Sequence, residues 1–106
     1  MKKVKEVCNT QGEIQGYYFR CPGCQRRHLV YTKEQFAGGA KWIFNGDLQK
    51  PTFTPSLFVN PKNHECYVPE LHSCHSFIRE GKIEFLSDCT HALAGKIIDL
   101  PDLNTI

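Results

Sequence analysis

Short runs of aromatic and β-branched residues, separated by turn residues, dominate the hydrophobic pattern of this chain. The first run is Gly16–Arg20, and a similar run, His28–Thr32, follows a tight turn. Paired runs of this kind on either side of a turn are typical of β-strands. We therefore predict a hairpin from Tyr17 to Thr32 with Cys21-Pro22-Gly23-Cys24 at its tip.

A second hairpin is predicted between Cys74 and Cys89, where two β-prone runs flank Glu80-Gly81. Side chains on a strand alternate between two faces, so a turn at Glu80-Gly81 determines which residues share a face. Cys89 becomes the diagonal neighbour of Cys74, about 7–8 Å away between Cα atoms. The directly opposed pairs on that face are Ile78 with Ile83, Ser76 with Phe85 and Cys74 with Ser87, while His75, Phe77 and Leu86 take the other face.

Weaker signals occur elsewhere along the chain. Trp42–Phe44 precede Asn45-Gly46, a dipeptide that favours a two-residue type I′ hairpin turn. Residues 96–100 predict a last strand, and residues 33–37 and 91–95 predict single helical turns.

These elements predict a mostly β protein over residues 1–106, as one small zinc-binding domain. We expect a hairpin and sheet fold, zinc-ribbon-like or β-tent-like, with one or two helical turns. Residues 1–15 form either an N-terminal extension or the first strand.

The composition is ordinary for a globular chain, with 106 residues of which 41% are hydrophobic and 23% charged, enough for one modest core. The net charge of +2 points to no class of partner. No apolar stretch approaches the roughly 20 residues that span a bilayer, and the basic start is not followed by the apolar core of a secretory signal. We therefore expect a cytoplasmic protein with no membrane partner. In a reducing compartment its six cysteines favour metal ligation or free thiols over disulfides.

The Cys-x-x-Cys turn is the strongest chemical signal, because it points two thiolates at one ion. A closed tetrahedral zinc site takes four protein ligands, and the second hairpin brings two further thiols to one face. We therefore predict zinc as the cofactor and the ligand set Cys21, Cys24, Cys74 and Cys89. His91 or His75 is the alternative fourth ligand, since sites with three cysteines and one histidine are common.

A zinc ion with four thiolate ligands has no open position for water, so a structural role is favoured over catalysis. The chain also lacks HExxH and the His-x-Glu that precedes Pro-Cys-x-x-Cys in zinc deaminases. One alternative is a zinc-dependent hydrolase or deaminase-like enzyme that uses His75 or His91 with Asp88. Another is a nucleic-acid-binding zinc module, suggested by aromatic and basic residues near the first turn: Tyr17, Tyr18, Phe19, Arg20, Arg26, Arg27 and His28.

Several segments together resemble an uncharacterised phage and prophage family that is often labelled ammonia monooxygenase. They are Cys21–Cys24, Trp42–Asp47, Pro51–Ser56, Cys74–Ile78 with Gly81–Ile83, and Asp88–Gly95. The resemblance covers about residues 20–103 and implies an association with bacterial operons for ubiquitin-like conjugation. The oxygenase label finds no support in the residues, because no copper or iron constellation of histidines and carboxylates can be assembled.

This chain departs from the family pattern in a longer loop from Pro61 to Ser73, so its His64, Cys66 and His72 are not carried over as metal ligands. The resemblance implies a phage-type protein in the cytoplasm of a host cell. Together with a structural zinc site, it leads us to predict a binding module for a host or phage protein partner.

Overall fold

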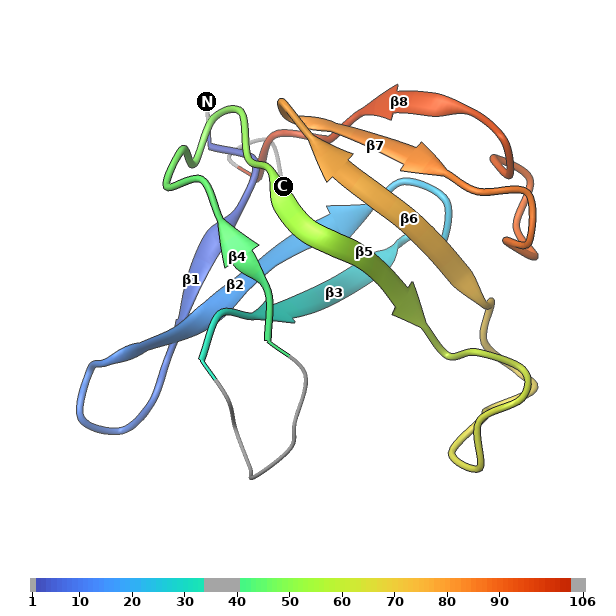
Figure 1. The fold of residues 1–106 in the computed structure, drawn as a ribbon, viewed down its shortest axis with the longest axis horizontal. Helices are drawn as coiled ribbons and strands as arrows, with labels where there is room; N and C mark the ends of the chain where they lie inside the picture. Colours follow the sequence, from blue (N-terminus) through green and yellow to red (C-terminus); the bar gives the residue numbers. More distant parts are fainter. Residues whose placement is uncertain (1, 34–40, 104–106) are drawn as a thin grey trace.

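Two antiparallel β-sheets make up the fold in the computed structural model, which describes residues 2–33 and 41–103 (Figure 1). The first sheet contains β1 (Lys5–Cys8), β2 (Ile14–Cys21) and β3 (Arg26–Tyr31), in that order. The second contains, in order, β4 (Ile43–Phe44), β5 (Phe53–Val59), β6 (Cys74–Arg79), β7 (Lys82–Phe85) and β8 (Ile97–Asp99). The prediction of a mostly β fold is confirmed, and β1 shows that the first 15 residues include a strand.

Both predicted hairpins are present, and the second has the expected register as far as Phe85, where β7 ends before the predicted pair of Cys74 with Ser87. In the first, Cys21 pairs with Arg26, so the Cys-x-x-Cys turn lies at the tip between β2 and β3. In the second, the register pairs Ser76 with Phe85 and Ile78 with Ile83. Glu80 and Gly81 have φ angles of 52° and 78°, the positive values that a two-residue type I′ turn requires.

The predicted two-residue turn at Asn45-Gly46 is wrong. β4 pairs with β5 through Phe44 and Phe53, so residues 45–52 form a longer loop. Within it, the Asn45 side chain accepts a hydrogen bond from the Asp47 N–H at 3.1 Å, and Asp47 accepts one from the Lys50 N–H at 3.0 Å. These local side-chain bonds offer the backbone an alternative to the hairpin ladder.

The described residues contain no α-helix. Residues 91–95 form a turn in place of the predicted helical one, and most of the other predicted helical turn, residues 34–37, lies outside the described part of the chain. None of the described elements is a helix long and apolar enough to cross a membrane.

One face of each sheet contributes to a shared core. Strand alternation directs Phe19 and Val30 from the first sheet, and Phe53, Ile78 and Ile83 from the second, into one buried cluster. Contacts between the sheets include Tyr17 with Phe44, whose ring centroids lie 4.4 Å apart. Figure 1 shows β5 and β6 lying across β2 and β3. The outward faces of the two sheets therefore remain available for function.

Candidate active site and metal centre

The tip of the first hairpin meets the second hairpin at a group of metal-ligating side chains. The group consists of Cys21, Cys24, Cys74 and His91, whose ligand atoms all lie within 4.8 Å of one another. Cys21 Sγ and Cys74 Sγ are 3.9 Å apart. Tetrahedral zinc with Zn–S bonds of about 2.3 Å holds two sulfurs about 3.8 Å apart. The spacing therefore suits a metal ion bound by three sulfurs and one nitrogen.

The absence of a side chain at Gly23 lets His91 enter this group. A Cβ atom at Gly23 would lie 2.6 Å from His91 Nδ1 and closer still to two other ring atoms. The backbone at Gly23 has no positive φ angle, so the requirement for glycine here is one of space. His91 Nε2 is buried without a hydrogen-bond partner among the described residues, a costly state that metal ligation would relieve.

The three thiols of the group are electrostatically coupled. Hydrogen bonds from the Cys24 and Cys74 thiols lower the pKa of Cys21. The interaction with the Cys21 sulfur in turn raises the pKa of Cys24 to about 12 and, together with burial, raises the pKa of Cys74. All three sulfurs can ionise together only beside a cation that offsets their charge, and this group could hold a metal ion in that place.

The structure brings together three of the four predicted ligands and adds His91, one of the two alternatives. Cys89 lies beside the group and is buried. Its sulfur accepts a hydrogen bond from the His75 N–H at 3.3 Å and donates one to the His75 carbonyl at 3.2 Å. Cys89 therefore holds the backbone of His75, and the His75 side chain takes part in a different site.

That second site is a chain of hydrogen bonds through His75. Ser56 Oγ lies 3.2 Å from His75 Nε2, and Asp88 Oδ2 lies 3.1 Å from His75 Nδ1. With the imidazole proton on Nδ1, the Ser56 hydroxyl donates to Nε2 and Nδ1–H donates to the carboxylate. This is the arrangement of a nucleophile, a general base and an orienting acid found in serine hydrolases.

Strand irregularity positions the serine. β5 pairs Phe53 with Ile78 and Leu57 with Ser76, so residues 54–56 stand opposite Phe77 alone. Bulges of this kind re-aim side chains and are frequent next to active sites. Trp42 Nε1–H donates to the Ser56 carbonyl at 3.2 Å and so ties the bulge to the preceding segment.

An aromatic contact positions the histidine. Phe58 pairs with His75 across β5 and β6, and the two rings stack 4.3 Å apart with an interplanar angle of 3°. The stacking partner and the backbone bonds from Cys89 together restrict both the ring and the main chain of His75. The side chains of His75 and Asp88 are 25% and 51% exposed, so the triad is accessible from solvent.

The metal group and the triad share two short segments. Along β6, Cys74 points into the core and His75 points outward, as strand alternation requires. After β7, the segment from Asp88 to His91 supplies the carboxylate on one side and the imidazole of the metal group on the other. A metal ion at the group would therefore fix the two segments that carry the base and the acid.

Sequence reasoning considered His75 and Asp88 together only as partners of a metal, and it missed Ser56 as a nucleophile. Ser56 is the last residue of Pro51–Ser56, one of the segments that carry the family resemblance. A single serine on a strand has no characteristic sequence spacing that would mark it as a nucleophile. Triads are recognised by geometry, and their order along the chain differs between folds.

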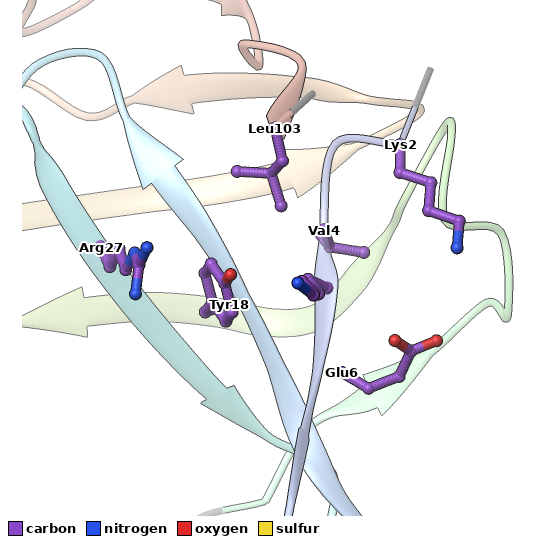
Figure 2. Close-up of a pocket in the computed structure, with 7 residues that line it drawn as sticks. Lys2, Val4, Glu6, Tyr18, Arg27 and Leu103 are labelled. Carbon is purple, nitrogen blue, oxygen red and sulfur yellow. The ribbon is translucent and has the colours of Figure 1, made fainter. Parts of the chain in front are cut away.

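The aromatic and basic residues near the first turn divide between the two faces of their sheet. Phe19 and His28 are buried, and Tyr17 packs on the core, so three of these seven residues contribute to the interior. Tyr18 and Arg27 lie on the outer face, with the guanidinium 4.7 Å from the ring centroid. Figure 2 shows both beside a cavity of about 420 Å³, also lined by Lys2, Val4, Lys5, Glu6 and Leu103. This cavity shares no residue with the triad or the metal group.

A comparison with known protein families shows which family the chain belongs to. Residues 2–86 match a family described as "Bacterial ubiquitination-like system serine protease (BubE)". The chain belongs to this family. The match contains Ser56 and His75 and ends two residues before Asp88. No curated protein and no solved structure matches the chain.

The BubE family description overturns the prediction of a zinc-stabilised binding module, because it names a protease. A structural role was favoured over catalysis because a fully ligated metal offers no site for water. A serine triad needs no such site, so that reason does not apply to it. The bacterial ubiquitination-like system agrees with the operon context that the resemblance implied. The phage origin stays a prediction.

Proposed function

We propose that this BubE-family protein is a serine protease in which Ser56 is the nucleophile, His75 the general base and Asp88 the orienting acid. The observation that carries the proposal is the continuous hydrogen-bonded chain from Ser56 Oγ through both ring nitrogens of His75 to Asp88. The family description supports it independently, since it names the same class of nucleophile.

Each residue then has a defined step. Ser56 Oγ attacks the carbonyl carbon of the scissile bond while His75 Nε2 takes the hydroxyl proton. The tetrahedral intermediate collapses, the C–N bond breaks, and the leaving amine receives that proton from His75. Water then attacks the Ser56 ester with His75 again as base, which releases the acid and restores the hydroxyl. Asp88 stabilises the imidazolium formed in both halves.

The proposed substrate class follows from the family description. A protease of a bacterial ubiquitination-like system would cleave a ubiquitin-like protein or a conjugate of one. A triad on the outward face of an open sheet suits such a substrate, because β5 and β6 expose Ser56 and His75 without a covering domain among the described residues. A protein partner is therefore expected as substrate.

The ion in this proposal is zinc, held by Cys21, Cys24, Cys74 and His91. Three sulfurs and one nitrogen at this spacing are a common structural zinc set, and four protein ligands leave zinc no open position. Zinc binding would contribute to folding free energy. It would act on catalysis indirectly, by fixing Cys74 next to His75 and His91 near Asp88.

A fluorophosphonate probe tests the nucleophile directly. The probe forms a bond from phosphorus to an activated serine oxygen and loses fluoride, and mass spectrometry of the digested protein locates the adduct. We expect the adduct on Ser56, none in Ser56→Ala, and normal labelling in Ser87→Ala, because Ser87 is an exposed serine adjacent to Asp88. An adduct on another residue, or peptide hydrolysis that survives Ser56→Ala, would refute the proposal.

A further inference from the structure

A cavity of about 420 Å³ lies on the outward face of the second sheet, separated from His75 of the triad by one side chain, Phe58. Phe58 forms one of its walls, and the ring of Phe58 is the one that stacks on His75. Ser56 and Phe58 are two positions apart on β5, so their side chains point to the same side. The other lining residues are Asn60, Pro61, His64, Cys66 and Tyr67.

The loop that closes this cavity is held in one shape by Asn60. The Asn60 side-chain amide donates to the carbonyls of Val68 and Leu71 at 2.9 and 3.1 Å, and its oxygen accepts the Val68 N–H at 2.8 Å. Turns within the loop add hydrogen bonds from the Tyr67 N–H to the His64 carbonyl at 3.0 Å and from the Cys66 N–H to His64 Nδ1 at 3.1 Å. A cavity preformed in this way binds a ligand without a large ordering cost.

The lining of the cavity combines apolar and uncharged polar side chains. Its lining contains no Lys, Arg, Asp or Glu, in contrast to the cavity on the other sheet, which has Lys2, Lys5 and Arg27. Large hydrophobic side chains are also exposed here, with Phe58 at 42%, Val68 at 40% and Leu71 at 36%. Phe58 stacks on His75, and Val68 and Leu71 belong to the loop bonded to Asn60, so exposed apolar side chains flank the cavity and indicate a binding surface.

We propose that this cavity is a substrate subsite that receives an uncharged, apolar side chain next to the scissile bond. The inference rests on the proposed protease function and adds to it the residues that select the sequence cleaved. Tyr67 and Phe58 supply the apolar walls, and the loop of residues 61–72 supplies the shape. The volume accommodates a Leu, Met or Phe side chain.

Cleavage of internally quenched peptides by the intact zinc-loaded protein tests the subsite. The peptides share one sequence in which a single position on either side of the cleaved bond is varied among Leu, Phe, Ala, Lys and Asp, and mass spectrometry identifies the bond. We expect kcat/KM for Leu or Phe to exceed that for Lys or Asp by about 10-fold to 100-fold at one of the two positions.

Two variants at one site assign that preference to the cavity. Tyr67→Ala should reduce the advantage of Leu and Phe by about 10-fold, and Tyr67→Asp should favour Lys in their place. Tyr18→Ala is the matched control, because Tyr18 lines the other cavity. The rate of fluorophosphonate labelling of Ser56 should stay unchanged in Tyr18→Ala.

The outcomes separate the two proposals. Normal labelling of Ser56 with no apolar preference, or with a preference that both Tyr67 variants leave intact, overturns the subsite and leaves the triad standing. Failure of Ser56 to label, together with failure to cleave any peptide, overturns the protease function and the subsite with it.

Discussion

Replacing Gly23 by alanine should remove His91 from the metal group without altering the fold of the turn. The added Cβ would lie 2.6 Å or less from ring atoms of His91, well inside van der Waals contact, so the imidazole must move. The backbone itself tolerates the change, since Gly23 has no positive φ angle. One methyl group thereby tests the position of one proposed zinc ligand.

The magnitude follows from the ligand count. Structural zinc sites of this kind bind with about 10–16 kcal/mol, so one of four ligands carries about 2.5–4 kcal/mol if the shares are equal. Loss of His91 should therefore weaken zinc binding by roughly 100-fold to 1,000-fold. In His91→Ala protein the same Gly23→Ala change meets no imidazole ring. There it should leave the free energy of unfolding unchanged or raise it by about 0.4–1 kcal/mol, because alanine reduces the conformational freedom of the unfolded chain.

Zinc affinity is measured by competition with a chromophoric chelator in the wild type, both single variants and the double variant. The four values form a double-mutant cycle, in which the Gly23→Ala penalty should disappear once His91 is absent. Wild-type affinity in Gly23→Ala protein would refute the reasoning, because it would mean that His91 is not a ligand. Cys89, the fourth ligand predicted from sequence, would then be the next candidate.

Further predictions concern the triad and its support. Asp88→Asn should lower kcat for peptide hydrolysis by about 10³-fold to 10⁴-fold with little change in KM, because the asparagine amide favours the wrong imidazole tautomer; a change confined to KM would contradict the assigned role. Cys89→Ala should keep one zinc per chain by atomic absorption yet lower kcat, because the His75 backbone loses both sulfur contacts. Cys74→Ser should lose zinc, and retention of one zinc per chain in that variant would refute the assignment of Cys74 as a ligand. Removal of zinc with a strong chelator should abolish activity and unfold the chain by circular dichroism, and added zinc should restore both; an active, folded apoprotein would show that zinc does not support the triad.

The two hairpins and the register of the second could be predicted because strand alternation and turn chemistry act locally. The placement of Cys74 and His75 on opposite faces followed from a period of two and the Glu80-Gly81 turn, and in the structure Cys74 is the one that faces the core. The longer loop after Asn45 could not be predicted, because Asn and Asp side chains bind nearby backbone groups as readily as they form a tight turn.

The candidate site depends on contacts that local patterns do not specify. Beyond Phe85 the chain leaves the sheet, and the Cys89 N–H bonds to the Leu86 carbonyl at 3.2 Å in a turn. Strand alternation then no longer decides between Cys89 and His91 as the fourth ligand. Ser56 reaches His75 only because β5 bulges opposite Phe77, and nothing in the residue types predicts that bulge.

The metal group and the proposed triad lie back to back on the same two segments of the chain. Domains of about 100 residues have modest cores, and a catalytic triad requires its members to stay within hydrogen-bond distance of one another. Here Asp88 lies in a turn and is half exposed, so apolar packing alone holds it weakly. Zinc bound to Cys74 and His91 would anchor both chain segments next to His75 and Asp88. Catalytic geometry would then depend on an ion that never contacts the substrate. As zinc is removed, kcat per chain should decrease in proportion to the zinc lost, while the KM of the fraction that remains active stays constant.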